Sequence, residues 1–536
     1  MSPLSYACGC LLCAGKSDFF SSFRDAQVVS ATWAAAAQPV TTVAFPYTGD
    51  YRIDTLIDGP EYRWNAGTPF GTPVVVTFSF MSVKPFYGGT DSGGDVGFTP
   101  FTAQQRNAAR EIFTRLDQEL GLQLVEVADS AGSFGQIRMG NNSQPFSAGY
   151  AFLPGTTDGA LDGDVWIDNS ITSQLVNLAP GSFAYATLAH EIGHALGLKH
   201  PGNYNAGETT VAMPGNFLGR AEDNTNFTIM SYRDAIGGQQ RDWFGLYDLL
   251  ALRTFYGAGN AQAGDTVYAL GDSAGRRLTT LVDSGGIDTL DFSSSTVGVV
   301  VDLLPGAFSS VGRNGSRLAT NNLSIDYATV IENVIGTAQG DLVLGNRVAN
   351  SFTLGAGMNE ADGGSGIDTA LYVSFASAYQ IQKTALGWNV TGQGANDTLI
   401  NIERLGFAER NIALDTNGRT TAKVLGVVFG KESLANFNYA GIGIRLLDEG
   451  MDYAGLIAVA LKAQLGSTAS NANVVNLLYS NIVGVLPSAG DFAYYNGLLT
   501  TGQQTQVSLG LLAAETAQNA LNINLVGINA SGVGYF

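Results

Sequence analysis

The chain has 536 residues, with 27 lysines and arginines against 46 aspartates and glutamates, and a formal net charge of −19. This length allows about three or four domains, and a hydrophobic share of 45% excludes a chain that is disordered throughout. The acidic balance leaves no large basic surface for phosphate backbones, so nucleic acid is not expected as a partner. The 68 glycines indicate many tight turns.

The N-terminal segment, residues 1–45, has no sustained periodicity. Its apolar patch, Ala7 to Ala14, is not preceded by Lys or Arg and so lacks the basic region of a secretory signal. No run of 18 or more apolar residues occurs anywhere, so no transmembrane segment is expected. All three cysteines, Cys8, Cys10 and Cys13, lie here, which excludes a disulfide framework for the rest. They could offer a thiolate to a metal, as an inhibitory propeptide does, or belong to a loose tail.

Residues 46–258 are predicted to form an α+β domain. Thr72 to Met81 is rich in β-branched and aromatic residues and indicates a strand. Thr102 and Gln105 make a capping box that begins an amphipathic helix, which is expected to stop at Gly121. Four strand-like runs and a second helical stretch follow, at Leu122–Val127, Gln136–Met139, Gly149–Leu153, Asp164–Ile167 and Ser182–Leu196.

Residues 259–415 are predicted to be β-rich, because Gly, Asp, Ser, Thr and Val dominate and helical periodicity is absent. Four contiguous nine-residue copies follow the pattern G-G-x-G-x-D-x-U-x, typical of parallel β-rolls that hold Ca²⁺ between successive turns. The last copy, GGSGIDTAL, is nearly complete, whereas the first three are degenerate: Asn350 and Asn359 replace Asp, and Thr337 and Gln339 replace glycines, so weaker binding is expected there. An ordinary glycine-rich β-meander is the alternative. The predicted ligands in the first and last copies are Gly336, Asp341, Gly363 and Asp368.

Residues 416–536 are predicted to form a small, mostly α-helical domain. Apolar residues recur there at i, i+3 and i+4, as in Tyr453 to Leu465 and Val507 to Leu521. The expected fold class is therefore multidomain α+β, with a parallel β-roll or β-sandwich between the first domain and the helical one.

The three histidines of the chain, His190, His194 and His200, form the motif H-E-x-x-H-x-x-G-x-x-H. His190 and His194 are four residues apart, so on a helix they project from one face and can bind one Zn²⁺. Gly197 permits a turn that lets His200 supply the third ligand. Three protein ligands leave a position for water, which is typical of a catalytic zinc site. Glu191 can accept the proton of that water.

A second motif supports this interpretation. HExxH alone can arise on any polar helix face, and Met230 alone could be any core methionine. Met230 lies in TIMSY, 30 residues after the third histidine, and fits the Met-turn of metzincin proteases. The combination of the two motifs is far more specific than either.

On these motifs the sequence resembles the serralysin family, which comprises secreted, zinc-dependent, calcium-binding bacterial metalloendopeptidases. The resemblance covers roughly residues 45–375. It implies a metzincin catalytic domain in which the three histidines bind one zinc, Glu191 is the general base, and Tyr232 ligates zinc or stabilises the transition state. Alternatively, Tyr232 is a buried aromatic residue. Besides HEIGHALGLKHPG and IMSY, the matching segments are YRIDTLIDG, GTPVVVTFSF, AGYAFLPG, GDVWID, LLALRTFYG and DSGGIDTLDFS.

The resemblance also implies several structural calcium ions. One site would use the carbonyls of Gln262, Gly264 and Thr266 with Asp283, Gly285 and Asp288, and a second would use Gly286, Asp288, Val330 and Glu332. Oxygen ligands of this kind suit Ca²⁺. Alternatively, Asp283 and Asp288 cap turns. GDVWID is expected to be an edge strand that pairs with substrate backbone.

Further implications are protein or peptide substrates, a monomer, and an extracellular or cell-surface location reached through a type I secretion apparatus. The segment from about residue 420 resembles a helical domain of unknown function found in other secreted repeat proteins. Two further hypotheses remain. One is a calcium-binding surface adhesin or structural repeat protein with an inactive protease domain. The other is a zymogen whose N-terminal segment blocks the cleft, and it is compatible with the protease hypothesis.

Overall fold

The computed structural model describes residues 40–41, 47–86, 96–144, 146–155, 161–204 and 216–536. The described chain divides into two compact units, the first ending at Ile331 and the second covering Glu332–Phe536. The three cysteines, and with them the propeptide hypothesis, lie outside the described residues. In the described part, no helix is both long and apolar enough to cross a membrane.

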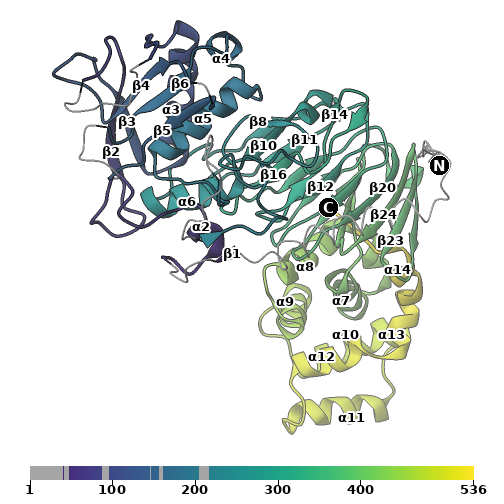
Figure 1. Cartoon of the computed structure of the whole chain (residues 1–536). Coiled ribbons are helices and arrows are strands. Elements are labelled where there is room, and N and C mark those ends of the chain that lie inside the picture. The colour runs from purple at the N-terminus through teal and green to yellow at the C-terminus, as the bar shows by residue number, and fades with distance from the viewer. Residues whose placement is uncertain (1–39, 42–46, 87–95, 145, 156–160, 205–215) are drawn as a thin grey trace. The chain divides into compact units, whose positions relative to one another are not determined.

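A five-stranded sheet in the order β3-β2-β4-β6-β5 forms the framework of the first unit (Figure 1). Four of its strands run parallel, and β5 pairs antiparallel with β6. Every strand predicted in this part of the chain is present. The strands are β2 (Val74–Phe80), β3 (Leu122–Glu126), β4 (Ile137–Asn142), β5 (Gly149–Ala151) and β6 (Val165–Asp168).

The position expected for GDVWID is wrong. These residues form β6, which lies between β4 and β5 and is buried along its whole length. The run Val165-Trp166-Ile167 is continuously apolar, as is typical of an interior strand covered on both faces. The edge strand on this side of the sheet is β5, which contributes the Gly149 to Ala151 segment, and the opposite edge is β3.

Two helices pack with the sheet around one core (Figure 1). α3 (Ala103–Glu119) begins with the predicted capping box at Thr102. α5 (Phe183–Ala195) begins at Ser182, whose side chain accepts a hydrogen bond from the Tyr185 amide. Every residue of α5 after Phe183 is buried, so the helix that carries the histidine motif runs through the interior rather than over the surface.

The rest of the first unit consists of short elements. β8 pairs in parallel with β10, and β10 with β16, which joins the segment after the histidine motif to the β-rich region. The helices are α2 (Tyr51–Asp54), α4 (Ser173–Val176), α6 (Leu246–Tyr256) and η1 (Asp272–Arg276). The strands are β1 (Val40–Thr41), β7 (Asn216–Phe217), β8 (Gln240–Arg241), β9 (Val267–Ala269), β10 (Arg277–Leu281), β11 (Thr289–Asp291), β12 (Val300–Asp302), β13 (Phe308–Ser309), β14 (Arg313–Asn314), β15 (Arg317–Leu318) and β16 (Leu323–Ile325).

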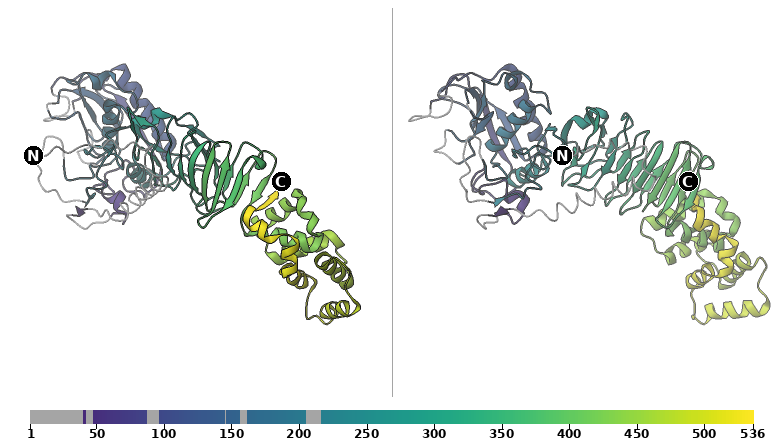
Figure 2. Two further views of the ribbon diagram at one scale, coloured as in Figure 1. Left: turned by 90° about the vertical axis from the view of Figure 1, so that its right-hand side faces the viewer. Right: turned by 45° about the vertical axis from the view of Figure 1, so that its right-hand side comes forward.

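The second unit begins with a parallel coil of short strands, drawn in green in Figure 2. Asn333 pairs with Ser351 and Ser351 with Thr369, a spacing of 351 − 333 = 18 residues. Two nine-residue copies therefore make one turn, and successive copies alternate between two sheets, as in a β-roll. The apolar eighth positions of the pattern, Val343, Phe352, Ala361 and Ala370, are all buried, as the pattern predicts.

The strands of this coil and the antiparallel strands after it run from residue 333 to 413. They are β17 (Asn333–Ile335), β18 (Leu342–Leu344), β19 (Ser351–Thr353), β20 (Gly357–Asp362), β21 (Thr369–Leu371), β22 (Gln380–Lys383), β23 (Trp388–Gly392), β24 (Ala395–Ile400), β25 (Arg404–Gly406) and β26 (Asn411–Ala413), with the short helix η2 (Ala376–Ala378) between β21 and β22.

The chain from residue 416 is helical, as predicted. The predicted stretch Tyr453–Leu465 is a helix, whereas Val507–Leu521 is divided in two because Thr516 caps a new helix. The elements are α7 (Thr416–Val424), η3 (Leu425–Phe429), η4 (Lys431–Ala435), α8 (Phe437–Asp448), α9 (Tyr453–Leu465), α10 (Asn471–Val483), α11 (Ala489–Thr500), α12 (Gln506–Ala514), α13 (Ala517–Asn522), α14 (Leu525–Ser531) and β27 (Val533–Tyr535).

Candidate metal centre

The local backbone brings the third histidine back to the helix that carries the first two. α5 holds His190 and His194 on one face and ends at Ala195. Gly197 then has a φ of +101°, a conformation that favours glycine, and a Cβ there would collide with the Tyr62 carbonyl oxygen. The chain reverses at this glycine, so His200 comes to face the other two histidines.

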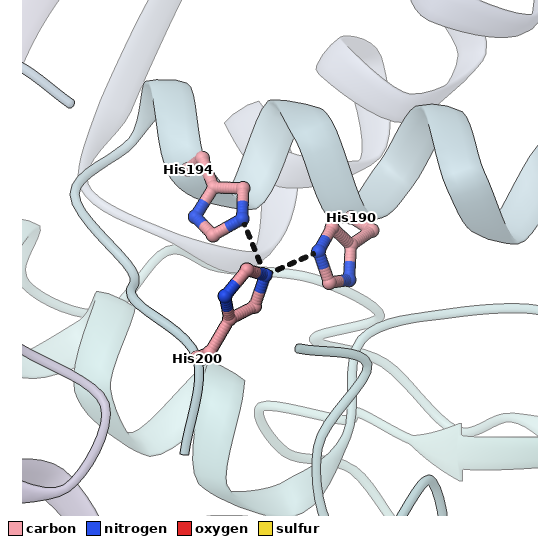
Figure 3. A group of neighbouring side chains, drawn as sticks. All are labelled: His190, His194 and His200. Carbon is pink, nitrogen blue, oxygen red and sulfur yellow. Dashed lines mark hydrogen bonds between the residues drawn. The ribbon is translucent and has the colours of Figure 1, made fainter. Parts of the chain in front are cut away.

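The three imidazole rings converge on one point (Figure 3). Nε2 of His200 lies 3.1 Å from Nε2 of His190 and 3.0 Å from Nε2 of His194. Two zinc–nitrogen bonds of about 2.0–2.1 Å at a tetrahedral angle would separate their nitrogens by about 3.3–3.4 Å. The spacing is therefore close to that of a zinc ligand set.

Hydrogen bonds on the opposite side of each ring set the orientation of the rings. Nδ1 of His190 lies 2.8 Å from the Ile229 carbonyl, and Nδ1 of His194 lies 2.7 Å from the Leu198 carbonyl. Nδ1 of His200 lies 3.1 Å from the carbonyl of Tyr204. A carbonyl only accepts hydrogen bonds, so each Nδ1 carries the proton and each Nε2 turns a lone pair to the centre. A single proton can be shared by only two of the three Nε2 atoms, whereas one metal ion can accept the lone pairs of all three. These residues therefore fit zinc.

Burial keeps two of these rings neutral. It lowers the pKa of His190 to about 3, and it lowers the pKa of His194 well below its usual value. The facing His200 ring acts in the same direction on both. Neutral imidazole is the form that binds metal, so near neutral pH little competition from protons is expected at these two ligands.

Glu191 lies next to the first histidine and is 5% exposed. Its Oε2 has no hydrogen-bond partner among the described residues. Burial raises the pKa of Glu191 to about 8 in the metal-free chain, and a divalent cation nearby would favour the ionised form. The Glu191 side chain is thus buried, with one oxygen that accepts no hydrogen bond from the described residues.

Gly149 of the edge strand β5 adjoins this carboxylate. A Cβ built on Gly149 would lie 2.8 Å from Cγ and 2.9 Å from Oε1 of Glu191. Only a residue without a side chain leaves Glu191 in its present place. The sequence did not single out Gly149, because the contact depends on how β5 packs on α5.

Met230 lies under the histidine helix. It is fully buried, and a Cβ on Gly193 would lie 2.8 Å from its sulfur. The preceding segment is fixed from α6, where Asp248 accepts hydrogen bonds from the Thr228 hydroxyl and the Ile229 amide. This is the position that a Met-turn occupies below a metal centre.

Tyr232 lies beside the cluster. Its ring centroid is 4.4 Å from that of His200 and 5.9 Å from that of His190. The side chain is 48% exposed, which contradicts the alternative of a buried aromatic residue. The Tyr232 ring therefore lies next to two of the three histidines.

The sequence also gave no sign of Asp223, which lies in this region. Asp223 is 3% exposed and accepts hydrogen bonds from Tyr204 and Ser231. Tyr204 follows the third histidine, His200, by four residues, so the sequence could have suggested Tyr204 as a residue of the site. No sequence pattern connects Asp223 with Tyr204 or with His200.

The predicted calcium ligands of the first unit lie in two segments that meet. The Thr266 amide donates to Asp288 at 2.8 Å, and a Cβ on Gly286 would lie 2.6 Å from the carbonyl carbon of Gly264. Asp283 accepts from the Gly285 amide at 2.9 Å. These are hydrogen bonds of turn-capping type, so the alternative reading of the two aspartates stays open. Gln262 has a φ of +53°, and Val330 and Glu332 flank the division between the two units.

In the second unit the predicted ligands pair off within single copies. Asp341 lies against Gly336 and Asp368 against Gly363, where a Cβ would come within 2.6 and 2.5 Å of the carboxylates. Oδ2 of Asp368 has no hydrogen-bond partner among the described residues, and burial raises the pKa of Asp368 to about 6.

Comparison with known proteins gives two family matches. The family model described as peptidase M10 serralysin C terminal matches residues 249–431, and the one described as metallo-peptidase family M12B reprolysin-like matches residues 164–242. The second contains the three histidines, Met230 and Tyr232. The first begins within α6 and contains all the predicted calcium ligands.

Three relatives match over more than half of this chain. They are metallopeptidase AprA of Pseudomonas marginalis, 33% identical over 57% of this chain and 66% of its own length; serralysin B of Dickeya chrysanthemi, 30% identical over 56% and 64%; and serralysin C of the same organism, 34% identical over 55% and 64%. The chain belongs to the serralysin-type metzincins.

This serralysin-type chain spans just under two thirds of the length of the curated relatives it matches. Its histidine cluster and Met-turn lie in the segment matched by a metallo-peptidase family, so the geometry and the comparisons identify the same part of the molecule.

Proposed function

We propose that the protein is a zinc-dependent metalloendopeptidase. The observation that carries this proposal is the convergence of three Nε2 lone pairs beside a buried Glu191, one oxygen of which accepts no hydrogen bond from the described part of the chain. When bound, zinc supplies a Lewis acid that polarises the scissile carbonyl and makes water a stronger acid.

The chain's own residues supply the remaining chemistry. Glu191 accepts the proton of the attacking water and delivers it to the leaving amine. Tyr232 donates from its hydroxyl to the oxyanion that develops on the substrate, or ligates the metal before substrate arrives. Gly149 leaves room for Glu191 next to the scissile bond.

The substrate is proposed to bind as an added strand along β5. Among the described strands, β5 is an edge of the five-stranded sheet, and it lies against the helix that carries Glu191. Backbone pairing at an edge selects extended peptides with little dependence on side chains, so broad specificity for unfolded proteins is expected.

The test is cleavage of casein by the zinc-loaded chain and by Glu191→Gln. The variant keeps the shape of the side chain but removes the base, so activity is expected to fall by about three orders of magnitude with zinc still bound. Glu119→Gln, at another buried glutamate outside the cluster, is the matched control and should remain active. Equal activity in Glu191→Gln would contradict the proposal, and so would an inactive wild type that holds one zinc.

We also propose that the β-roll binds structural calcium and that the protein acts outside the cell after export through a type I apparatus. Support comes from the roll geometry and the buried carboxylate of Asp368. Calcium binding is tested by calorimetry on the full chain, and export by coexpression with and without a type I transporter. Absence of calcium uptake, or of transporter-dependent release, would contradict the respective part.

A further inference from the structure

We propose that Tyr204 and Asp223 are positioning residues that hold Tyr232 at the histidine cluster. This inference rests on the proposed function, and it adds two residues through which the phenol of Tyr232 is set in place.

Asp223 is the anchor of the arrangement. Its Oδ1 accepts the Tyr204 hydroxyl at 2.6 Å and the Ser231 hydroxyl at 2.7 Å, and its Oδ2 pairs with Nε of Arg233 at 2.8 Å. Ser231 and Arg233 are the two neighbours of Tyr232 in the chain. A single buried carboxylate therefore binds the side chains of both neighbours of Tyr232.

Tyr204 connects this anchor to the histidines. Its carbonyl accepts the Nδ1 proton of His200 at 3.1 Å, and its hydroxyl accepts the Tyr232 amide at 3.3 Å. Its ring stacks on that of Tyr232 with centroids 4.9 Å apart and 27° between the planes. The ring of Tyr232 thus packs against both His200 and Tyr204, with centroid distances of 4.4 and 4.9 Å, and these two rings also lie 5.7 Å from each other.

This arrangement separates two tasks of Tyr204. The backbone carbonyl orients a metal ligand, whereas the hydroxyl orients Tyr232 through Asp223 and through the Tyr232 amide. A substitution that removes only the hydroxyl should therefore leave metal binding intact and disturb the step in which Tyr232 acts. Tyr232 is half exposed, so its ring depends on such contacts to stay in one rotamer.

The experiment measures kcat, KM and zinc affinity for Tyr204→Phe, Tyr232→Phe and the double variant, with zinc affinity taken from competition with a chelator. Tyr204→Phe keeps the stacked ring and the carbonyl. We expect kcat to fall about tenfold with KM within about twofold and zinc affinity within about threefold of wild type, since removal of an outer-shell partner typically costs 10- to 100-fold in affinity or activity.

The double variant is the decisive measurement. If Tyr204 acts through Tyr232, then Tyr204→Phe has almost no further effect in the Tyr232→Phe background. Asp223→Asn, which gives up the charge but keeps an oxygen acceptor, serves as a second variant and should be non-additive in the same way. Tyr479→Phe is the matched control, since it removes a hydroxyl that donates to Asp491 at 3.0 Å in the second unit.

Each outcome is decisive for one statement. Additive losses in the double variant, or a fall in zinc affinity parallel to that in kcat, would overturn the positioning role and leave a purely structural network. Full activity of Tyr204→Phe would overturn it as well. An inactive wild type that holds zinc would instead contradict the proposed function.

Discussion

The carboxylate of Glu191 is confined by its neighbours more than by hydrogen bonds. Its helix is buried, one of its oxygens has no partner among the described residues, and the edge strand approaches it at Gly149. Small changes in this packing are expected to move the carboxylate by a fraction of an ångström, and displacement of a catalytic group by 1 Å can cost about 10²-fold in rate.

Gly149→Ala tests this confinement. The new methyl group would lie 2.8 Å from Cγ of Glu191, so the glutamate must rotate away from the site. We expect at least a roughly tenfold loss of kcat with a change in stability within about 1 kcal/mol, because the crowded atoms belong to a side chain rather than to backbone. Steady-state kinetics and thermal melts check both. Gly132→Ala, where a Cβ meets nothing within 4 Å, should be neutral. Unchanged activity of Gly149→Ala would show that the base lies elsewhere.

Tyr232→Phe tests the phenol next to the histidines. Removing one donor to a developing oxyanion typically costs about 10²-fold in kcat. We expect a loss of that order with zinc retained, because the three imidazoles remain. Tyr47→Phe, at another partly exposed tyrosine of the same unit, is expected to behave as wild type. A variant as active as wild type would leave the Tyr232 ring with a packing role only.

At the scale of elements, asparagine side chains stand at positions of the β-roll where the nine-residue pattern predicts calcium-binding aspartates. Oδ1 of Asn359 accepts the Asp341 amide at 3.0 Å, and its Nδ2 donates to Asp397 at 2.8 Å. Asn359 and Asp397 are both 1% exposed. The Asn359 amide thus donates a hydrogen bond to the buried Asp397 carboxylate, which a cation such as Ca²⁺ could stabilise instead.

Asn359→Asp should make this part of the roll dependent on calcium. The new side chain cannot donate to Asp397, so two buried carboxylates face each other unless a cation lies between them. We expect a loss of roughly 2–3 kcal/mol in chelator and recovery in millimolar calcium. Asn401→Asp, an exposed asparagine that donates to Asp362 at 2.8 Å, is the control. Thermal unfolding with and without calcium measures the difference, and equal loss in both media would refute the idea.

The features that could be predicted from the sequence are those set by residues close together in the chain, and the features that could not are set by contacts between distant residues. The β-roll was predictable because its nine-residue period is visible in the sequence, and α3 was predictable from its capping box and apolar spacing. The place of β6 inside the sheet was not, because a strand's own residues do not say which strands flank it. The contacts among Tyr204, Asp223 and Ser231 form only after folding, so no local pattern announces them.

At the scale of the whole molecule, buried ionisable groups make stability depend on pH in two opposing directions. Burial raises the pKa of Asp248 and Asp302 to about 6, so the folded chain binds more protons than the unfolded one between about pH 4 and 6. Their contribution to stability is complete below pH 4 and is lost as pH rises through 6. His190 and His194 act in the opposite sense, because burial lowers their pKa.

The metal-free protein should therefore lose stability on acidification through these two histidines. Between pH 6.5, where an unfolded histidine titrates, and pH 3, near the folded pKa of His190, the unfolded chain binds more protons, so stability falls as pH falls. Each fully titrating group contributes about 1.4 kcal/mol per pH unit, so the pair should contribute roughly 2–3 kcal/mol per unit near pH 5. Denaturant unfolding in chelator at pH 5 and 7, followed by the fluorescence of the buried Trp166 and Trp243, measures this slope.

The double variant His190→Gln/His194→Gln keeps every buried carboxylate and removes both imidazoles, so the difference between its slope and that of wild type isolates the contribution of the two histidines. Equal slopes would mean that the two rings bind protons as readily in the folded chain as in the unfolded one, and that the centre is not preorganised for metal.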